Sequence, residues 1–180
     1  MHFTAETPIA YPARVVVDTM MNRMHDLVVH LPNVESIDTQ LIEPQPDGTV
    51  KTVRHWQGTA KSVPAVMRPF VSRRSLGWMD YAVWYPDELR CEWRTVSDSG
   101  DLTACSGTNA FRASGDGSSC VMVIDGDFIV HGERLPGVPA FMGRKIAPTI
   151  ERIVLSFMKP NFTSSADGLK ALLDSERGAS

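Results

Sequence analysis

The spacing of apolar and polar residues changes along the chain and predicts an order of elements. Residues 2–9 (HFTAETPI) alternate well enough for an edge strand. Apolar residues then recur at helical spacing, after Pro12, which a first helical turn tolerates, and before Pro32, which ends the pattern. We therefore expect one long helix or two short ones over residues 12–31.

Six further stretches have strand patterns and are separated mostly by turn sequences such as PQPDG, SDSGD and SGDGS. These stretches are residues 35–43, 49–60, 75–85, 89–97, 103–113 and 119–131. Residues 61–72 hold two prolines and predict a loop with one helical turn at most. The pattern as a whole is typical of an antiparallel meander of hairpins.

A long amphipathic helix is predicted at the C-terminal end. Residues 132–143 are rich in Gly and Pro and predict a connecting loop. Beyond them an apolar stripe begins near Pro148, which we interpret as a first-turn proline. Pro160 is expected to kink or interrupt the helix, which should reach roughly residue 175.

This order of elements predicts a two-layer α+β fold. An antiparallel sheet with one face to cover and one long amphipathic helix to cover it form such a pair of layers. A chain of 180 residues fits one domain of ordinary size, and we expect residues 1–180 to form a single domain.

The stretches HFTAETPIAYPARVV, GDGSSCVMVIDGDFIVHG and GRKIAPTIERIV, in this order, resemble uncharacterised bacterial members of the START-like superfamily, also called SRPBCC. That superfamily includes lipid-transfer domains, relatives of the birch pollen allergen, and aromatic polyketide cyclases. The resemblance covers nearly the whole chain and is one of architecture. It implies a helix-grip (Bet v 1-like) fold, in which a curved antiparallel sheet wraps around a long C-terminal helix. One fold hosts many activities, so function does not follow from it directly.

Charge and cysteine content narrow the function classes. The net charge is -3 and the basic residues are scattered, so we expect no nucleic-acid partner. The nearest basic cluster is Arg68, Arg73 and Arg74, which we interpret as solvated or paired, with an anionic head group as the lesser alternative. Three cysteines without CxxC spacing predict free thiols in a reducing compartment. With no secretory signal pattern and no long apolar run, these features favour a cytoplasmic protein without a transmembrane segment.

No motif for metal, nucleotide or nucleophilic chemistry occurs in the sequence. HExxH, GxSxG and phosphate-loop patterns are absent, and His25 and His30 have the wrong spacing to share a metal on a helix. We therefore expect no metal and no cofactor, and we assign no catalytic residue.

Large aromatic residues on the predicted strands could line a cavity. Strand parity places Trp78, Asp80 and Trp84 on one face of residues 75–85. Any one tryptophan could instead simply fill the core. Taking these strands together with the last helix and the segment before it, we predict the following ligand contacts: Trp56, Trp78, Asp80, Trp84, Trp93, Asn109, Phe111, Phe141, Ile150, Val154 and Phe157.

Two polar groups could add chemistry to such a cavity. If Asp80 faces inward, burial should raise the pKa of its carboxyl unless Arg or His pairs with it. Arg54 and His55 are adjacent on a strand, so at most one of them can face the cavity.

The last predicted strand carries Asp125, Asp127 and His131 on one face. We expect this face to be the solvent side, with a proton donor or acceptor for catalysis as the alternative. In the segment that follows, Pro139, Phe141 and Met142 could form a lid, because glycines flank them on both sides.

We expect a binding protein rather than an enzyme, with a hydrophobic small molecule such as a lipid, sterol, fatty acid or polyketide-like compound in an internal cavity, which the protein could also transport. The alternative is an enzyme of the polyketide cyclase/aromatase or hydrolase kind, which requires Asp80, His55 or Arg94 to converge in the cavity. A third hypothesis is an interaction module that pairs through an exposed sheet face. The sequence is compatible with a monomer or a homodimer.

Overall fold

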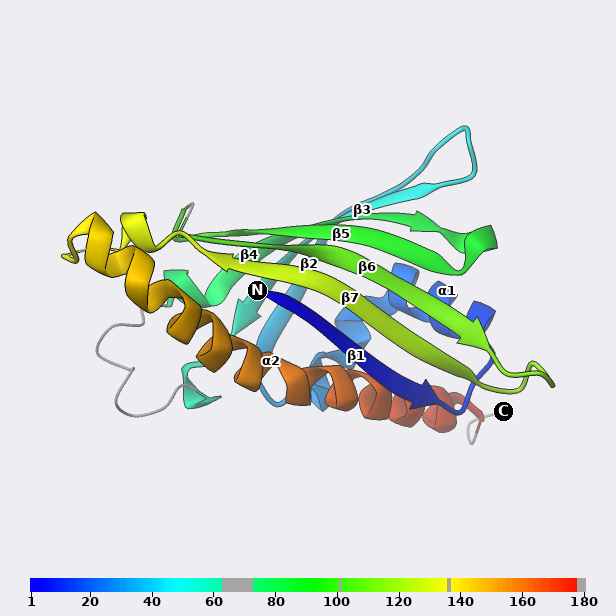
Figure 1. The fold of residues 1–180 in the computed structure, drawn as a ribbon. Coiled ribbons are helices and arrows are strands. Elements are labelled where there is room, and N and C mark those ends of the chain that lie inside the picture. The colour runs from blue at the N-terminus through cyan, green and yellow to red at the C-terminus, as the bar shows by residue number, and fades with distance from the viewer. Residues whose placement is uncertain (63–72, 101, 136, 178–180) are drawn as a thin grey trace.

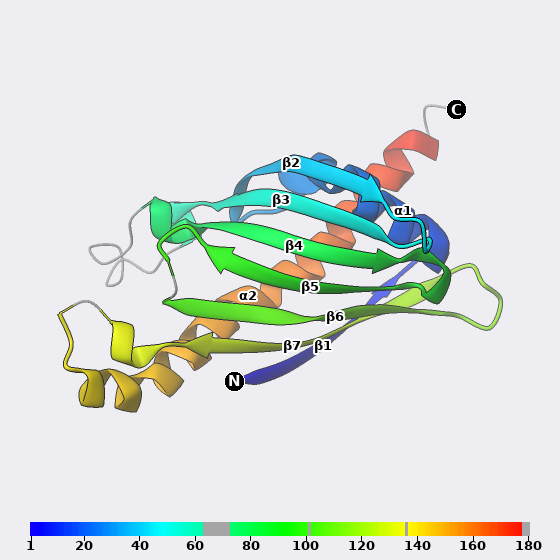
Figure 2. The same cartoon turned by 90° about the horizontal axis from the view of Figure 1, so that it is seen from above.

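A curved antiparallel sheet forms one layer of the molecule, and a long helix crosses its concave side (Figures 1 and 2). The structure is a computed structural model that describes residues 1–62, 73–100, 102–135 and 137–177, with residues 62, 157–163, 176 and 177 described by their backbone alone. Within these ranges the sheet has the order β1-β7-β6-β5-β4-β3-β2. Its strands are β1 (His2–Ile9), β2 (Val34–Pro44), β3 (Val50–Gly58), β4 (Gly77–Tyr85), β5 (Arg90–Ser97), β6 (Thr103–Ala113) and β7 (Cys120–Val130).

The meander predicted from the turn sequences is confirmed. Each of the six later strands pairs antiparallel with its neighbour in sequence, and β1 pairs with β7 at the edge. The predicted α+β class, with a curved sheet around a C-terminal helix, is therefore correct.

Two helical regions lie on the concave side. The first is α1 (Ala13–Arg23) followed by the 3-10 helix η1 (Met24–His30), so the expected helical region over residues 12–31 consists of two segments. The second is α2 (Ala140–Arg177). Short 3-10 turns complete the chain: η2 (Ala60–Ser62), η4 (Arg74–Leu76), η5 (Pro86–Glu88) and η6 (Gly132–Arg134). None of the described helices is long and apolar enough to cross a bilayer.

The start of α2 differs from the prediction. The helix begins at Ala140, so the last residues of the expected loop are helical, and Pro148 lies well inside the helix rather than in its first turn. It also continues through Pro160 without a break. Pro148 is exposed, so its ring meets water and the lost backbone hydrogen bond is the main cost.

Close contacts to the end of β7 explain why the helix starts early. A Cβ atom on Gly143 would lie 1.8 Å from the carbonyl oxygen of Gly132, so only two glycines allow the backbones of α2 and η6 to approach this closely. The carboxylate of Glu151 accepts a hydrogen bond of 2.9 Å from the backbone N–H of Val130. These contacts fix the N-terminal half of α2 to the edge of the sheet.

The other half of α2 closes a dense core. Trp84, Val16, Leu27 and Leu169 come from β4, α1, η1 and α2 and are almost fully buried. A Cβ atom on Gly168 would lie 2.6 Å from the Cβ atom of His30, so α2 and η1 are in close contact here. The molecule therefore has a tightly packed interior at the end of the sheet that holds α1.

Candidate ligand-binding site

The concave face of the sheet carries the residues that strand parity predicted. Across β3, β4 and β5, Trp56 lies opposite Trp78, and Asp80 lies opposite both Arg54 and Thr95. Residues directly opposite one another in an antiparallel pair point to the same face. These side chains therefore share the side that α2 crosses.

Two of the predicted contacts belong to the packed core. Trp84 is 2% exposed, and its indole N–H donates a hydrogen bond of 3.1 Å to the hydroxyl of Thr52. Phe111 is 3% exposed. Both side chains are surrounded by protein, so we leave them out of the candidate ligand contacts.

The tryptophans at the other end of the same face are only partly covered. Trp56, Trp78 and Trp93 each keep some exposure although they point to the interior. The Trp56 and Trp78 rings stack with centroids 5.8 Å apart, and the Trp93 N–H donates to Oδ1 of Asn109 at 2.9 Å. Large aromatic side chains lose exposure when a neighbour packs on them, so the space in front of these rings is incompletely filled.

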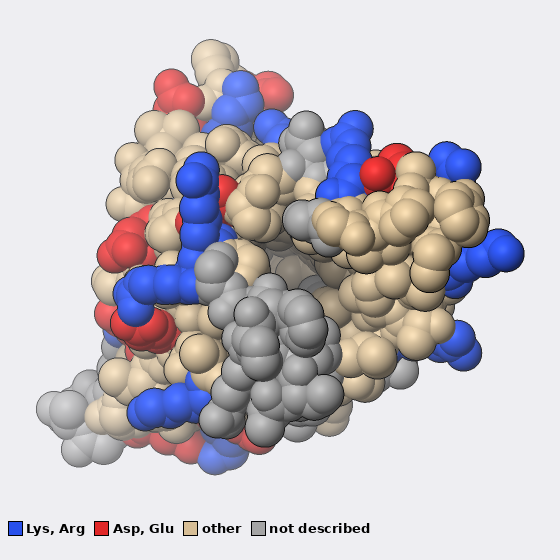
Figure 3. All heavy atoms as spheres, turned by 90° about the vertical axis from the view of Figure 1, so that its left-hand side faces the viewer, with Lys and Arg blue, Asp and Glu red and all other residues tan. Residues whose placement is uncertain are grey.

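The surface is hollowed at this end of the molecule. Figure 3 views the end of the molecule that lies on the left-hand side of Figure 1, and it shows a deep recess in the surface there. We use the term recess for this space, and we take as its candidate walls the partly buried, inward-facing Trp56, Trp78, Asp80 and Trp93 of the sheet together with Ile150 of α2. The indole N–H of Trp56 is buried and lacks a hydrogen-bond partner among the described residues.

The helix side of the site is apolar. Ile150 and Val154, two of the predicted ligand contacts, are partly buried and pack against the core. Phe141 is 59% exposed and Met142 is 48% exposed, and both lie in the first turn of α2. The predicted loop is therefore wrong at these two residues, because they are helical, and their role as a lid stays a hypothesis. The predicted contact Phe157 lies on α2, but its side chain is outside the described residues.

Arg54 is a buried cation at the boundary between the recess and α1. It is 1% exposed, and its guanidinium donates to the Thr52 hydroxyl at 3.1 Å, to the backbone oxygen of Met20 at 3.3 Å, and to that of Met21. Met20 and Met21 lie near the C-terminal end of α1, where carbonyl groups favour a positive charge. Burial lowers the pKa of Arg54, but an arginine stays charged in a protein.

Asp80 is the carboxylate next to this cation. Burial raises the pKa of Asp80 to about 6, against the opposite pull of the Arg54 charge. Its side chain keeps some exposure, and it accepts no hydrogen bond among the described residues. A carboxyl group that titrates near neutrality can accept or donate a proton in this site.

No protein-family model matches the sequence, and no curated protein matches it either. Solved structures match over nearly its whole length. The Zhui aromatase/cyclase from Streptomyces sp. R1128 has a TM-score of 0.68 at 15% identity, covering 100% of this chain and 96% of that one. TTHA0849 from Thermus thermophilus has a TM-score of 0.65 at 18% identity, covering 95% of each chain. Ara h 8.0201, a Bet v 1 allergen, has a TM-score of 0.59 at 10% identity, covering 95% of this chain and 98% of that one.

The chain has the helix-grip fold of the START-like, or Bet v 1-like, proteins. At these identities the likeness establishes the fold, and the site must be argued from the residues of this chain.

The convex face of the helix-grip sheet holds two residues that the enzyme hypothesis needed inside. His55 contacts the carboxylate of Asp98 at 2.7 Å, and the Arg94 guanidinium lies 4.4 Å from the centroid of the Tyr81 ring. On their strands His55 and Arg94 alternate with the inward-facing Arg54 and Thr95, so they point away from α2. His55 and Arg94 therefore do not converge with Asp80, as the alternative enzyme hypothesis required of them.

The acidic pair on β7 also lies on the convex face, as predicted. Asp125 and Asp127 are exposed, and the ring of His2 lies between them, 3.5 Å from one carboxylate and 3.6 Å from the other. These groups are solvated and separate from the recess.

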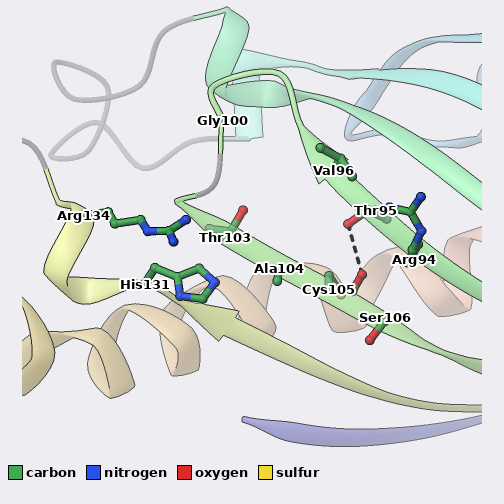
Figure 4. Close-up of a pocket in the computed structure, with 10 residues that line it drawn as sticks. All are labelled: Arg94, Thr95, Val96, Gly100, Thr103, Ala104, Cys105, Ser106, His131 and Arg134. Carbon is green, nitrogen blue, oxygen red and sulfur yellow. Dashed lines mark hydrogen bonds between the residues drawn. The ribbon is translucent and has the colours of Figure 1, made fainter.

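A pocket of about 360 Å³ lies at the end of β5 and β6 near η6 (Figure 4). Arg94, Ser106, His131 and Arg134 contribute to its walls. Its walls include the outward-facing Arg94 and Val96 as well as the inward-facing Thr95 and Cys105, and Asp80 is not among them. We do not include it in the candidate ligand site.

Arg54 is the site residue whose role sequence reasoning missed. The helix-grip sheet places it opposite Asp80, and this register depends on how β3 and β4 pair across the long connection between them. Parity showed that at most one of Arg54 and His55 faces inward, but no local signal distinguished them.

Proposed function

We propose that this chain binds an apolar small molecule in the recess between the concave sheet and the N-terminal half of α2. The observation that carries the proposal is the partial exposure of three inward-facing tryptophans, Trp56, Trp78 and Trp93. Covering apolar surface with a ligand is favourable because it removes that surface from water. Aromatic walls with few polar groups suit a lipid, sterol, fatty acid or polyketide-like molecule.

The structural neighbours support a ligand-binding role without identifying the ligand. One is named an aromatase/cyclase and another is a Bet v 1 allergen. Carriage of the ligand between sites in the cytoplasm is the form of this function that we favour.

A change that fills the recess tests the proposal. Thr95 lies on the inner face of β5, and Val96, its neighbour, points to the convex side. Thr95→Phe should weaken binding of the neutral dye Nile red about tenfold, because overpacking costs about 1–3 kcal/mol and about 1.4 kcal/mol is a factor of ten. Val96→Phe, the matched control, should bind as the wild type does.

Fluorescence titration of the full chain with the dye measures both variants. The proposal fails if the wild type does not bind the dye, or if the two variants lose affinity equally. Native mass spectrometry of protein purified from its own host, followed by organic extraction, would identify a bound molecule.

A second candidate function is a cyclase-like enzyme that uses the same recess. The specific observation in its favour is the Asp80 carboxyl, whose pKa of about 6 suits proton transfer near neutral pH. This function predicts that Asp80→Asn keeps affinity for a polyketide-like substrate and loses its turnover. A variant that turns over the substrate at the wild-type rate would exclude it.

A further inference from the structure

The hydrogen-bonding groups on the inner face are unequally available to a ligand. Arg54 directs its donors to Thr52 and to the end of α1. The Trp93 N–H and Oδ1 of Asn109 satisfy each other, and the Thr95 hydroxyl points to the backbone oxygen of Cys105 at 3.5 Å (Figure 4). Each of these groups already has a protein partner, except for the Nε–H of Arg54, which is buried and has no partner among the described residues.

Asp80 differs from these groups. Its carboxyl lies on the inner face, is partly exposed, and receives no hydrogen bond from the described residues. An ionised carboxylate can only accept hydrogen bonds, and leaving it without a donor in a buried place is costly. The group that would satisfy it must therefore come from water or from the ligand.

We propose that Asp80 selects the ligand: it accepts a hydrogen bond from a neutral hydroxyl or phenol group and disfavours molecules that present an anion. This inference rests on the proposed function and narrows its ligand class to hydroxylated apolar molecules, away from fatty acids. A hydroxyl that donates to a carboxylate forms one of the stronger kinds of hydrogen bond. A second negative charge beside Asp80 would be repelled in a poorly solvated site.

Arg54 does not reverse this preference. It is buried, and the N–H groups with partners point to Thr52, Met20 and Met21, so it offers an anion no exposed donor. Its charge acts at longer range and favours the ionised form of Asp80.

The selection should depend on pH in opposite directions for the two ligand types. The titratable groups that interact with Asp80 are Arg54 and the thiols of Cys91 and Cys105. Burial raises the pKa of both thiols to about 12, so they stay neutral near physiological pH. With the pKa of Asp80 at about 6, acidification neutralises this carboxylate, which weakens phenol binding and relieves the repulsion of an anion.

A matched pair of probes tests this inference: 2-naphthol, which is neutral, and 2-naphthalenesulfonate, which carries the same rings and stays ionised. Isothermal titration calorimetry of the full chain should show the wild type binding naphthol about tenfold more tightly than the sulfonate at about pH 7.5, because the naphthol hydroxyl can donate a charge-assisted hydrogen bond to the ionised carboxylate. The preference should shrink at about pH 5, as the carboxylate is protonated. Asp80→Asn should reduce the preference and remove its pH dependence, and Asp125→Asn, on the convex face, should change neither.

The outcomes separate the inference from the function beneath it. Equal or tighter binding of the sulfonate by the wild type at neutral pH overturns the inference, as does an unchanged pH dependence in Asp80→Asn. If that variant does not fold, Asp80→Ser replaces it, and the pH profile of the wild type decides independently. Nile red binding without a naphthol preference rejects the inference alone, whereas absence of dye binding rejects the proposed function.

Discussion

The space between the sheet and α2 has two ends that contain the same kinds of residue but differ in how completely those residues are buried. At one end Trp84 is 2% exposed and lies among side chains of α1, α2 and the sheet. At the other end Trp56 and Trp78 lie on the same strands and face, yet remain partly exposed beside the recess. Sheet and helix are common to both ends, so a third element must cause the difference.

That element is the helical segment formed by α1 and η1. It lies between the sheet and the C-terminal half of α2, where Val16 and Leu27 are almost fully buried (Figure 1). No described helix fills the corresponding place between the sheet and the N-terminal half of α2. Arg54 stands at the boundary, with its guanidinium bonded to the end of α1 and Asp80 opposite it. One end is thus a packed core, and the other holds the recess in which we propose that a ligand binds.

The largest expected effect compares the tryptophans of the two ends. Trp84→Ala should lower the free energy of unfolding by about 4 kcal/mol, because it leaves a cavity in a packed core. Trp78→Ala should cost only about 1 kcal/mol, mainly from the lost stacking on Trp56, while it weakens Nile red binding.

Denaturant unfolding measures both values, and dye titration measures affinity. If Trp78→Ala destabilises the protein as much as Trp84→Ala does, the open end is a packed core and the comparison is wrong.

A somewhat smaller effect is expected at the boundary. Arg54→Met leaves two α1 carbonyl groups without their donor and Asp80 without its counter-charge, which should cost about 3 kcal/mol near neutral pH. Removing the cation also raises the pKa of Asp80 further above its unfolded value.

The pH dependence of this loss has a definite sign. An acid with a raised pKa in the folded state contributes stability that is present at low pH and is lost as pH rises through the folded pKa. Protonation of Asp80 at about pH 5 should therefore shrink the loss caused by Arg54→Met. Urea titrations of wild type and variant at both pH values test this, and an equal loss at the two values would argue against coupling between Arg54 and Asp80.

A third effect on stability, smaller than those expected for Trp84→Ala and Arg54→Met, is expected where α2 meets η6. Gly143→Val would place atoms against the backbone of Gly132 and should cost about 2 kcal/mol through overpacking. The displaced helix should also change dye affinity, since it forms one wall of the recess. Gly115→Ala is the control, because nothing lies within 4 Å of the added atom. Unchanged dye affinity in Gly143→Val would show that this half of α2 does not shape the site.

Strand parity was the most reliable guide to the site. It placed Trp78, Asp80 and Trp84 on one face of β4, and this face is the inner one in the structure. It also favoured the solvent face for Asp125, which is exposed. A period of two follows from the backbone of any strand, whatever surrounds it. The same reasoning could not separate the buried Trp84 from the partly exposed Trp78, which lie six residues apart on one face of β4.

Positions that depend on contacts between distant elements were predicted less well. The early start of α2 depends on the approach of Gly143 to Gly132, and the burial of Arg54 depends on the end of α1. Neither contact leaves a local pattern, because its partners come from separate parts of the chain.

By itself, therefore, the sequence determined the order of the elements, the α+β class and which residues of each central strand share a face, since these follow from local periodicity and turn chemistry. The tertiary structure alone decided which end of the interior is filled, which of Arg54 and His55 is buried, and that Asp80 lacks a donor among the described residues. These features depend on where α1 and α2 come to rest on the sheet, and that position is set by packing between residues far apart in the chain.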